Sequence, residues 1–318
     1  IVSGGELFRV RKAGGGNIIF SGVGKSEAEL RDASDVLSIN VESLEELSLI
    51  SEMKLTYPIS LRLNPDISVD THPYISTGLR SSKFGIPLEQ LQDALSIIKA
   101  GNLNLIGLSC HIGSHISDVS VLRSAYLSLR EKFEEIKRLG FSLNLIDFGG
   151  GLAINLNLQE FEGMLKEVIN GLDARVIFEP GKFLVAESGV LLTRVLYRKD
   201  NGTHKFAVVD AGMNDLIRPS LYDAYHDIQS LSTSPQMEEI SVVGPVCETG
   251  CFLGNARQLP VLKRGDLLII RDSGAYGFSM SSNYNSRPRA SEVAIELDGS
   301  IRCIRNRETY ESLVVSEP

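Results

Sequence analysis

The first 185 residues repeat one pattern, in which a short apolar run of strand length is followed by a loop and then by an amphipathic stretch of helix length. Clear apolar runs lie at 17–21, 36–40, 59–63, 103–110, 143–148 and 175–178, and Ile1–Val2 could be the end of a further strand. The amphipathic stretches cover 26–33, 43–51, 88–100, 119–139 and 158–172. Alternating strands and helices are typical of a parallel sheet whose strands are joined by crossover helices.

Polar or glycine residues stand at the end of each apolar run. They read Ser-Gly-Val-Gly, Arg-Leu-Asn-Pro, His-Ile-Gly-Ser, Gly-Gly-Gly and Glu-Pro-Gly-Lys. In a β/α barrel, functional residues gather at the carboxyl ends of the strands. The sequence therefore predicts a TIM-like β/α barrel that is one strand short of eight, with its site at that end.

The rhythm changes at about residue 186. Apolar or alternating runs then follow one another without long helices, at 188–197, 205–210, 239–246, 266–271 and 291–297. This pattern favours a mostly antiparallel β domain. We expect an α/β chain of two domains: a β/α barrel over 1–185, incomplete at its N-terminus and lacking its first strand, and a β domain over 186–318.

Charge and cysteine content disfavour several classes of protein. The net charge of -8 and the pI of about 5.3 disfavour nucleic-acid and anionic-membrane partners. No apolar run approaches the roughly 18–20 residues that span a bilayer. Four scattered cysteines make no disulfide framework, and no second Cys/His pair completes a zinc site beside Cys247 and Cys251. We expect a cytoplasmic enzyme without a metal.

One nucleotide-binding motif is incomplete. Gly22-Val23-Gly24-Lys25-Ser26 resembles the end of a P-loop, but the position five residues before Gly24 is Ile19 instead of the required glycine. We therefore interpret Lys25 as a solvated residue at the start of a helix.

Three strand ends together suggest a site for a phosphate. The glycine loop Gly149–Gly151 would allow backbone N–H groups close to an anion, although a plain tight turn explains it equally well. His111 and Ser114 follow another strand, and a lone histidine there is more often structural. The last strand ends in Glu179, Pro180, Gly181 and Lys182. Three such loops on one barrel face favour a phosphate-bearing cofactor.

The second domain supplies further candidates. Cys247 beside Glu248 suggests proton transfer, with a small buried hydrophobe as the alternative for the cysteine. Arg218 and Tyr222 could bind a carboxylate, or could be a surface arginine and a core tyrosine. Tyr276 lies in the glycine-containing segment Asp-Ser-Gly-Ala-Tyr-Gly.

Taken in order, these blocks resemble the fold-type III pyridoxal-phosphate decarboxylases, the group that includes ornithine, arginine and diaminopimelate decarboxylases. The resemblance covers nearly the whole chain through VSGGEL, FSGVGKS, LRLNP, HIGSHI, DFGGG and EPGKFLVAESGVLLTRV, and then GPVCETG. RPSLYDAYH and GAYGFSMSSNYNSRPR are typical of the diaminopimelate branch. The implied activity is decarboxylation of meso-2,6-diaminopimelate to L-lysine, with pyridoxal 5'-phosphate as cofactor.

The resemblance also implies roles for the candidate residues. His111 would stack on the pyridine ring, and Glu179 would pair with its nitrogen, which keeps the ring a good electron sink. Cys247 would be the general acid. The phosphate would be held by Ser114, by Gly149, Gly150 and Gly151, by the backbone of Gly181 and Lys182, and by Tyr276. The resemblance also places Pro180 among the cofactor-binding residues.

The far end of the substrate would be bound by residues of both domains. The resemblance implies this role for Lys182, Arg218, Tyr222, Glu248 and Tyr276. Members of the family are dimers, so a homodimer is implied in which Cys247 and Glu248 complete the neighbouring subunit's site.

The sequence departs from the family pattern at a few positions. Lysine stands at position 182 where the family usually has arginine, so a planar bidentate donor becomes a point charge. Cys251 stands where aspartate is usual, and His115 replaces a common glutamine. The Schiff-base lysine of the family belongs to a segment upstream of VSGGEL, and we expect the chain as given to lack it, since none of Lys12, Lys25, Lys54 and Lys83 lies in such a segment. Two alternatives stay open: another basic amino-acid decarboxylase, or a non-catalytic homologue.

Overall fold

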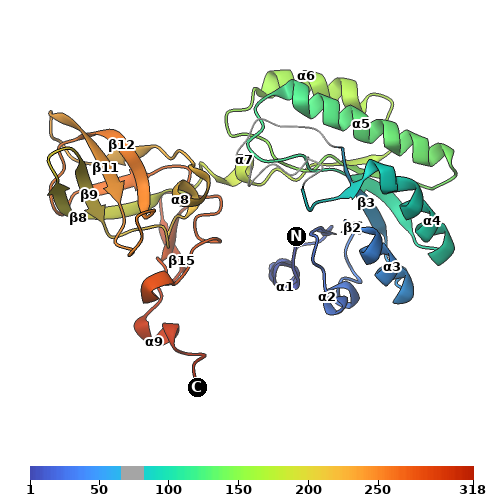
Figure 1. Cartoon of the computed structure of the whole chain (residues 1–318), viewed down its shortest axis with the longest axis horizontal. Coiled ribbons are helices and arrows are strands. Elements are labelled where there is room, and N and C mark those ends of the chain that lie inside the picture. Colours follow the sequence, from blue (N-terminus) through green and yellow to red (C-terminus); the bar gives the residue numbers. More distant parts are fainter. Residues whose placement is uncertain (66–81) are drawn as a thin grey trace. The chain divides into compact units, whose positions relative to one another are not determined.

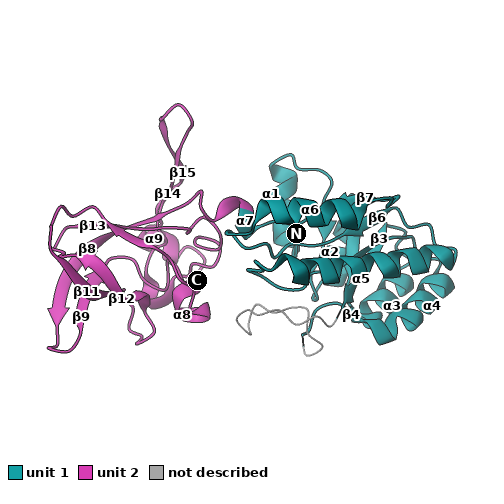
Figure 2. Ribbon diagram, turned by 90° about the horizontal axis from the view of Figure 1, so that it is seen from above, with its two compact units in different colours: residues 1–183 teal, residues 184–318 magenta. Residues whose placement is uncertain are grey.

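The computed structural model describes residues 1–65 and 82–318 of the chain. These residues form two compact units, Ile1–Phe183 and Leu184–Pro318, which Figure 2 colours separately. Each unit has its own hydrophobic core. Among the described residues, no helix is long and apolar enough to cross a membrane.

The first unit is built on a parallel sheet, as predicted. Its strand order is β1-β2-β3-β5-β6-β7, and β4 (Ile86–Pro87) pairs with β3 off this path. The strands on the path are β1 (Ile19–Phe20), β2 (Ser38–Val41), β3 (Ile59–Asn64), β5 (Leu105–Ser109), β6 (Leu145–Asp147) and β7 (Arg175–Ile177). Each predicted apolar run contains or overlaps one of these strands, and the sheet curves into part of a barrel.

The free edge of β1 carries hydrogen bonds to the first residue. The amino group of Ile1 donates to the carbonyl of Ile19 at 2.9 Å, and the N–H of Ser21 donates to the carbonyl of Ile1 at 2.8 Å. These two bonds have the spacing of a parallel pair. Ile1 therefore continues the sheet beside β1, as expected for a residue at the end of a strand.

Helices follow the strands, with starts that the sequence marks clearly. They are α1 (Gly4–Lys12), α2 (Glu27–Asp32), α3 (Leu44–Glu52), the short 3-10 helix η2 (Leu88–Gln90), α4 (Leu91–Gly101), α5 (Val119–Arg138), α6 (Leu158–Ile169) and α7 (Lys182–Val185). Ser26 forms the capping box expected at the start of α2. Ser43 caps α3 through the N–H of Glu46, but the Glu46 side chain accepts from the N–H of Glu42 instead of Ser43. Figure 1 shows α5 and α6 side by side.

The two faces of this sheet differ in chemistry. The face toward the helices is apolar and includes Ile39, Leu61 and Leu108. Because successive strand side chains alternate between faces, the other positions point to the interior of the barrel. These positions include seven buried polar residues: Ser38, Asn40, Ser60, Arg62, Asn64, Ser109 and Asp147. The site at the strand ends therefore lies above a polar interior.

The second unit is a mixed β domain. Its six-stranded sheet has the order β10-β13-β8-β9-β11-β12, and only the pair β9–β11 is parallel among these neighbours. The strands are β8 (Leu191–Asp200), β9 (Lys205–Val209), β10 (Ile228–Ser230), β11 (Met237–Val243), β12 (Phe252–Pro260) and β13 (Leu267–Ile270). The prediction of a mostly antiparallel domain is confirmed.

Shorter elements complete this unit. They are α8 (Arg218–Tyr222), the 3-10 turn η3 (Tyr284–Ser286), the hairpin β14 (Glu292–Ile295) and β15 (Ile301–Arg305), and α9 (Tyr310–Leu313). α8 carries two of the predicted site residues, Arg218 and Tyr222.

Candidate active site

The carboxyl ends of β5, β6 and β7 bring three predicted residues together. Ser109 pairs with Asp147, and Asp147 with Ile177, so the residues that follow these strands are neighbours. The N–H of Gly150 donates to Nδ1 of His111 at 3.2 Å, and the N–H of Glu179 donates to the carbonyl of Gly149 at 2.8 Å. The histidine, the glycine loop and the glutamate thus form one hydrogen-bonded cluster.

The glycine loop is tightly constrained by its neighbours. A Cβ atom on Gly149, where φ is +69°, would lie 2.2 Å from the carbonyl oxygen of Cys110. A Cβ atom on Gly150 would come equally close to the carbonyl oxygen of Glu179, and one on Gly151 (φ +94°) to that of Gly113. Backbone packing therefore requires glycine at all three positions. This explains the Gly-Gly-Gly run more directly than a turn alone.

A buried cation lies in the same unit. Lys182 is buried, and its Nζ donates to Oγ of Ser114 at 3.3 Å. The bond joins two residues that the sequence assigned to the phosphate. The N–H of Gly151 has no hydrogen-bond acceptor in the part of the chain that the structure describes. A cation, a hydroxyl and a backbone donor are the groups that an anion would need.

The imidazole of His111 is uncharged at neutral pH. Burial, and then the nearby Arg62 guanidinium, lower the pKa of His111 to about 4. Since Nδ1 accepts from Gly150, the proton of the neutral ring is on Nε2. A neutral ring offers a flat face on which a planar ligand could stack without a positive charge on the imidazole.

Sequence reasoning missed several buried polar residues around this cluster. Arg62 donates to Oε1 of Glu42 at 2.9 Å, and its guanidinium lies 4.8 Å from the centre of the Phe84 ring. Asp147 is completely buried, and its Oδ1 accepts from the N–H of Gly149 at 2.9 Å. The sequence does show a polar residue within each of these predicted strands. Only the strand register tells that its side chain points to the interior of the barrel.

The interpretation of Lys25 was wrong. Its ammonium is fully buried and contacts Oε1 of Glu46 at 2.8 Å. It also donates to the carbonyls of Gly22 and Asn40. Lys25 therefore ties the loop after β1 to β2 and α3.

In the second unit, three predicted residues lie close together. Arg218 is partly desolvated, which lowers its pKa, while the nearby hydroxyls of Tyr276 and Tyr222 and the carboxylate of Asp272 act in the opposite direction. Nη1 of Arg218 also contacts Nε2 of His226 at 3.2 Å. One guanidinium flanked by two phenols is suited to binding a carboxylate.

Cys247 and Glu248 are exposed and lie against η3. The N–H of Cys247 donates to Oδ1 of Asn285 at 3.0 Å, and the hydroxyl of Tyr284 donates to Oε1 of Glu248 at 2.5 Å. Tyr284 and Asn285, which are neighbours in η3, thus hold Glu248 and Cys247, the two neighbouring residues predicted for proton transfer and substrate binding. Because Cys247 is exposed, its alternative interpretation as a small buried hydrophobic residue is wrong.

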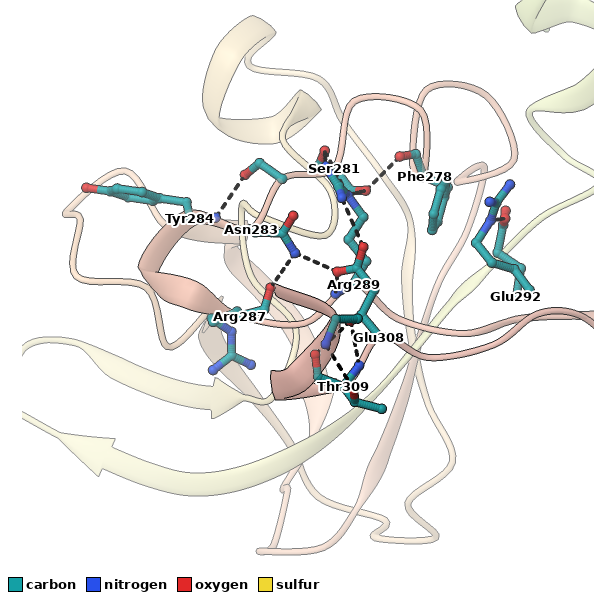
Figure 3. Close-up of polar contacts among 12 residues, drawn as sticks. Phe278, Ser281, Asn283, Tyr284, Arg287, Arg289, Glu292, Glu308 and Thr309 are labelled. Carbon is teal, nitrogen blue, oxygen red and sulfur yellow. Dashed lines mark hydrogen bonds and ion pairs between the residues drawn. The ribbon is translucent and has the colours of Figure 1, made fainter. Parts of the chain in front are cut away.

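The segment that carries Tyr284 is itself anchored. Figure 3 shows that the carboxylate of Glu308 binds Asn283 on one side of the turn and Arg289 on the other, at 2.6 Å and 3.1 Å. Residues on both sides of η3 are therefore fixed to one acidic group.

Comparison with known proteins decides the family. Residues 1–186 match the family model described as pyridoxal-dependent decarboxylase, pyridoxal binding domain. The chain belongs to the pyridoxal-dependent decarboxylases. Diaminopimelate decarboxylase of Aquifex aeolicus is 43% identical over 99% of this chain and 79% of its own length, and that of Neisseria meningitidis serogroup B is 44% identical over 100% and 80%.

Solved structures agree with the assignment to this decarboxylase family. Diaminopimelate decarboxylase from Helicobacter pylori, complexed with L-lysine, superposes with a TM-score of 0.93 at 40% identity, over 99% of this chain and 83% of that one. Lysine decarboxylase from Selenomonas ruminantium, at 22% identity and a TM-score of 0.81, covers 91% of this chain and 78% of its own and shares the fold. The predicted cofactor, pyridoxal phosphate, is confirmed at the level of the family.

Proposed function

We propose that this protein catalyses the pyridoxal-phosphate-dependent decarboxylation of meso-2,6-diaminopimelate to L-lysine. The observation that carries the proposal is the hydrogen-bonded cluster of His111, the glycine loop and Glu179 at the strand ends of a chain that is 43% identical to a diaminopimelate decarboxylase over 99% of its length.

The residues present fit the cofactor. The glycine loop, Ser114 and Lys182 would hold its phosphate, together with the backbone of Gly181, and Pro180 would lie beside the cofactor. His111 would stack on the ring, and Glu179 would bind the pyridine nitrogen. When bound, pyridoxal phosphate supplies an electron sink for the electron pair left by departing carbon dioxide.

The second unit would recognise the far end of the substrate. Diaminopimelate carries a second amino-acid group there, with one carboxylate and one ammonium. Arg218 with Tyr222 and Tyr276 offers donors for the carboxylate, and Glu248 offers an anion for the ammonium. Tyr276 would also reach the cofactor phosphate, and Lys182 would add a positive charge to the substrate site.

Proton return would fall to Cys247. Its exposed thiol, on a loop held by Asn285, would protonate the carbon that has lost carbon dioxide. The proposal includes a cytoplasmic homodimer in which Cys247 and Glu248 complete the neighbouring subunit's site. It assigns the Schiff-base lysine to neither of the buried lysines, because Lys25 and Lys182 already bind neighbouring groups.

The departure at Cys251 does not by itself argue for another substrate. Its buried sulfur lies within contact distance of Gly212 and Gly244 and accepts from the N–H of Met213 at 3.4 Å. The thiol therefore fills a loop interior where a charged aspartate would need a partner.

A substrate panel tests the proposal. The protein, expressed at full length and loaded with pyridoxal phosphate, is assayed for carbon dioxide release from diaminopimelate, ornithine, arginine and lysine. We expect release from diaminopimelate alone, and Cys247→Ala should reduce it by about 10²–10⁴-fold while cofactor binding is retained. Release only from substrates without the second carboxylate would refute the substrate assignment, and no release from any would favour a non-catalytic homologue.

A further inference from the structure

Asp147 holds an unusual position beneath the site. It is the last residue of β6 and has no exposed surface. Its Oδ1 accepts from the N–H of Gly149 at 2.9 Å. Its Oδ2 is also buried and has no hydrogen-bond donor among residues 1–65 and 82–318. An unpartnered carboxylate oxygen in the interior is costly, so this atom needs an explanation.

The strand register places Asp147 next to Glu179. Asp147 pairs with Ile177 of β7, and Glu179 follows two residues after that strand partner. The N–H of Glu179 donates to the carbonyl of Gly149 at 2.8 Å, so the backbone of the glutamate is fixed beside the loop that Asp147 anchors. The backbone thus brings the two carboxyl groups close to each other, and a hydrogen bond between them would require a proton on one of them.

The proton belongs on Asp147. Burial first, and then the negative charge of Glu179, raise the pKa of Asp147 well above its usual value. The N–H of Gly149 and the side-chain amide of Asn40 from β2 act in the opposite direction on Asp147. Two buried groups also interact with Asp147: the Cys110 thiol, whose own pKa burial raises to about 12, and the Tyr126 hydroxyl, whose pKa burial also raises. Glu179, by contrast, is exposed and is the better hydrated of the two acids.

We propose that Asp147 is a positioning residue that keeps a proton on Oδ2 at neutral pH and donates it in a hydrogen bond to the carboxylate of Glu179. With Oδ1 it anchors the glycine loop at the same time. Glu179 is thereby held in the orientation that meets the pyridine nitrogen, a role that rests on the proposed cofactor function. One buried acid thus couples the ring contact to the phosphate loop.

The proposal makes a sharp distinction between two substitutions. Asp147→Asn keeps an oxygen for Gly149 and places an N–H₂ donor where the acid carries its proton, so it should replace a protonated aspartic acid. Asp147→Ala removes both contacts. If Asp147 worked as an anion instead, asparagine would fail as badly as alanine. Ser109→Ala is the matched control, since Ser109 is buried on the same face one strand away and pairs with Asp147 in register.

The first measurement is infrared spectroscopy of the chain without added cofactor, with ¹³C-labelled aspartate. We expect a protonated-carboxyl band at pH 7 that shifts with the label, is lost in Asp147→Asn and persists in Ser109→Ala. Absence of that band in the wild type, or its survival in Asp147→Asn, would overturn the proposal. This arm does not depend on whether the chain binds pyridoxal phosphate.

The second measurement is equilibrium dialysis with pyridoxal and with pyridoxal phosphate. For both ligands we expect Asp147→Ala to weaken binding about tenfold or more, because a hydrogen bond to a charged group contributes that much. Asp147→Asn and Ser109→Ala should stay within about threefold of wild type. In a Glu179→Gln background, Asp147→Ala should have little further effect on pyridoxal, which lacks the phosphate.

The outcomes distinguish a failure of the role proposed for Asp147 from a failure of the proposed cofactor site. Equal loss in Asp147→Asn and Asp147→Ala, or an undiminished effect of Asp147→Ala on pyridoxal in the Glu179→Gln background, would overturn the role of Asp147. Failure of the wild type to bind either ligand would refute the proposed cofactor site, and the infrared band would still decide the protonation of Asp147. If Asp147→Ala does not fold, the Asp147→Asn comparison and the infrared arm carry the test.

Discussion

The neutral state of His111 should make the first unit sensitive to mild acid. The folded pKa is about 4, against a usual value of 6.5, so the unfolded chain takes up a proton first as the pH falls. The stabilisation is fully present above pH 6.5 and is lost between 6.5 and 4. The difference corresponds to about 3 kcal/mol in total, of which about 2 kcal/mol is lost by pH 5.

The perturbation that isolates this contribution is His111→Asn. Asparagine can still accept from the N–H of Gly150 but does not titrate. Urea unfolding should be followed by far-UV circular dichroism, because the long helices belong to the first unit. Between pH 7 and pH 5, the free energy of unfolding should fall by about 2 kcal/mol more in the wild type than in His111→Asn.

A direct reading comes from the histidine side-chain resonances. The chain has five histidines, and the signal absent from His111→Asn identifies position 111. We expect that signal to titrate far below the usual range. A pKa near 6.5 for this resonance, or parallel loss of stability in wild type and variant, would refute the argument that burial and Arg62 keep the imidazole neutral.

Three further substitutions follow from the contacts described. Lys25→Met should destabilise the first unit by about 3–5 kcal/mol, because Glu46 is left buried without its cation; urea unfolding measures the loss, and the double variant with Glu46→Gln should recover part of it. Tyr284→Phe should raise KM for diaminopimelate about tenfold with a smaller change in kcat, since the hydrogen bond that orients Glu248 is lost; an unchanged KM would contradict that role. Gly149→Ala should reduce cofactor affinity at least about tenfold in dialysis, because its Cβ atom cannot fit beside a backbone oxygen without moving the loop.

The elements that the sequence predicted are those with a clear apolar period. Every strand on the main path of the first sheet followed from a short apolar run, and in β2 and β3 every residue on both faces is buried. The strands that were missed lack such a period: β12 carries Asn255 and Arg257 within a nine-residue strand, and all five residues of β15 are exposed. α1 was missed because it begins with Gly4 and Gly5, which disfavour helix, and depends on its Ser3 cap.

The residues of the candidate site were likewise predictable where they follow a strand and not predictable where they lie within one. His111, Glu179 and Lys182 follow strands in the sequence, so their shared location could be predicted from topology alone. Asp147 and Arg62 lie within strands that read as apolar, and their function depends on which face they point to. A one-residue change in register would turn either side chain toward the helices, where the apolar face offers no hydrogen-bond partner among the described core residues. Burial of an acid beside Glu179 is thus a property of pairing between β6 and β7, which no single run of residues contains. For that reason the test of Asp147 is also a test of how the polar interior of the barrel controls the groups at its rim.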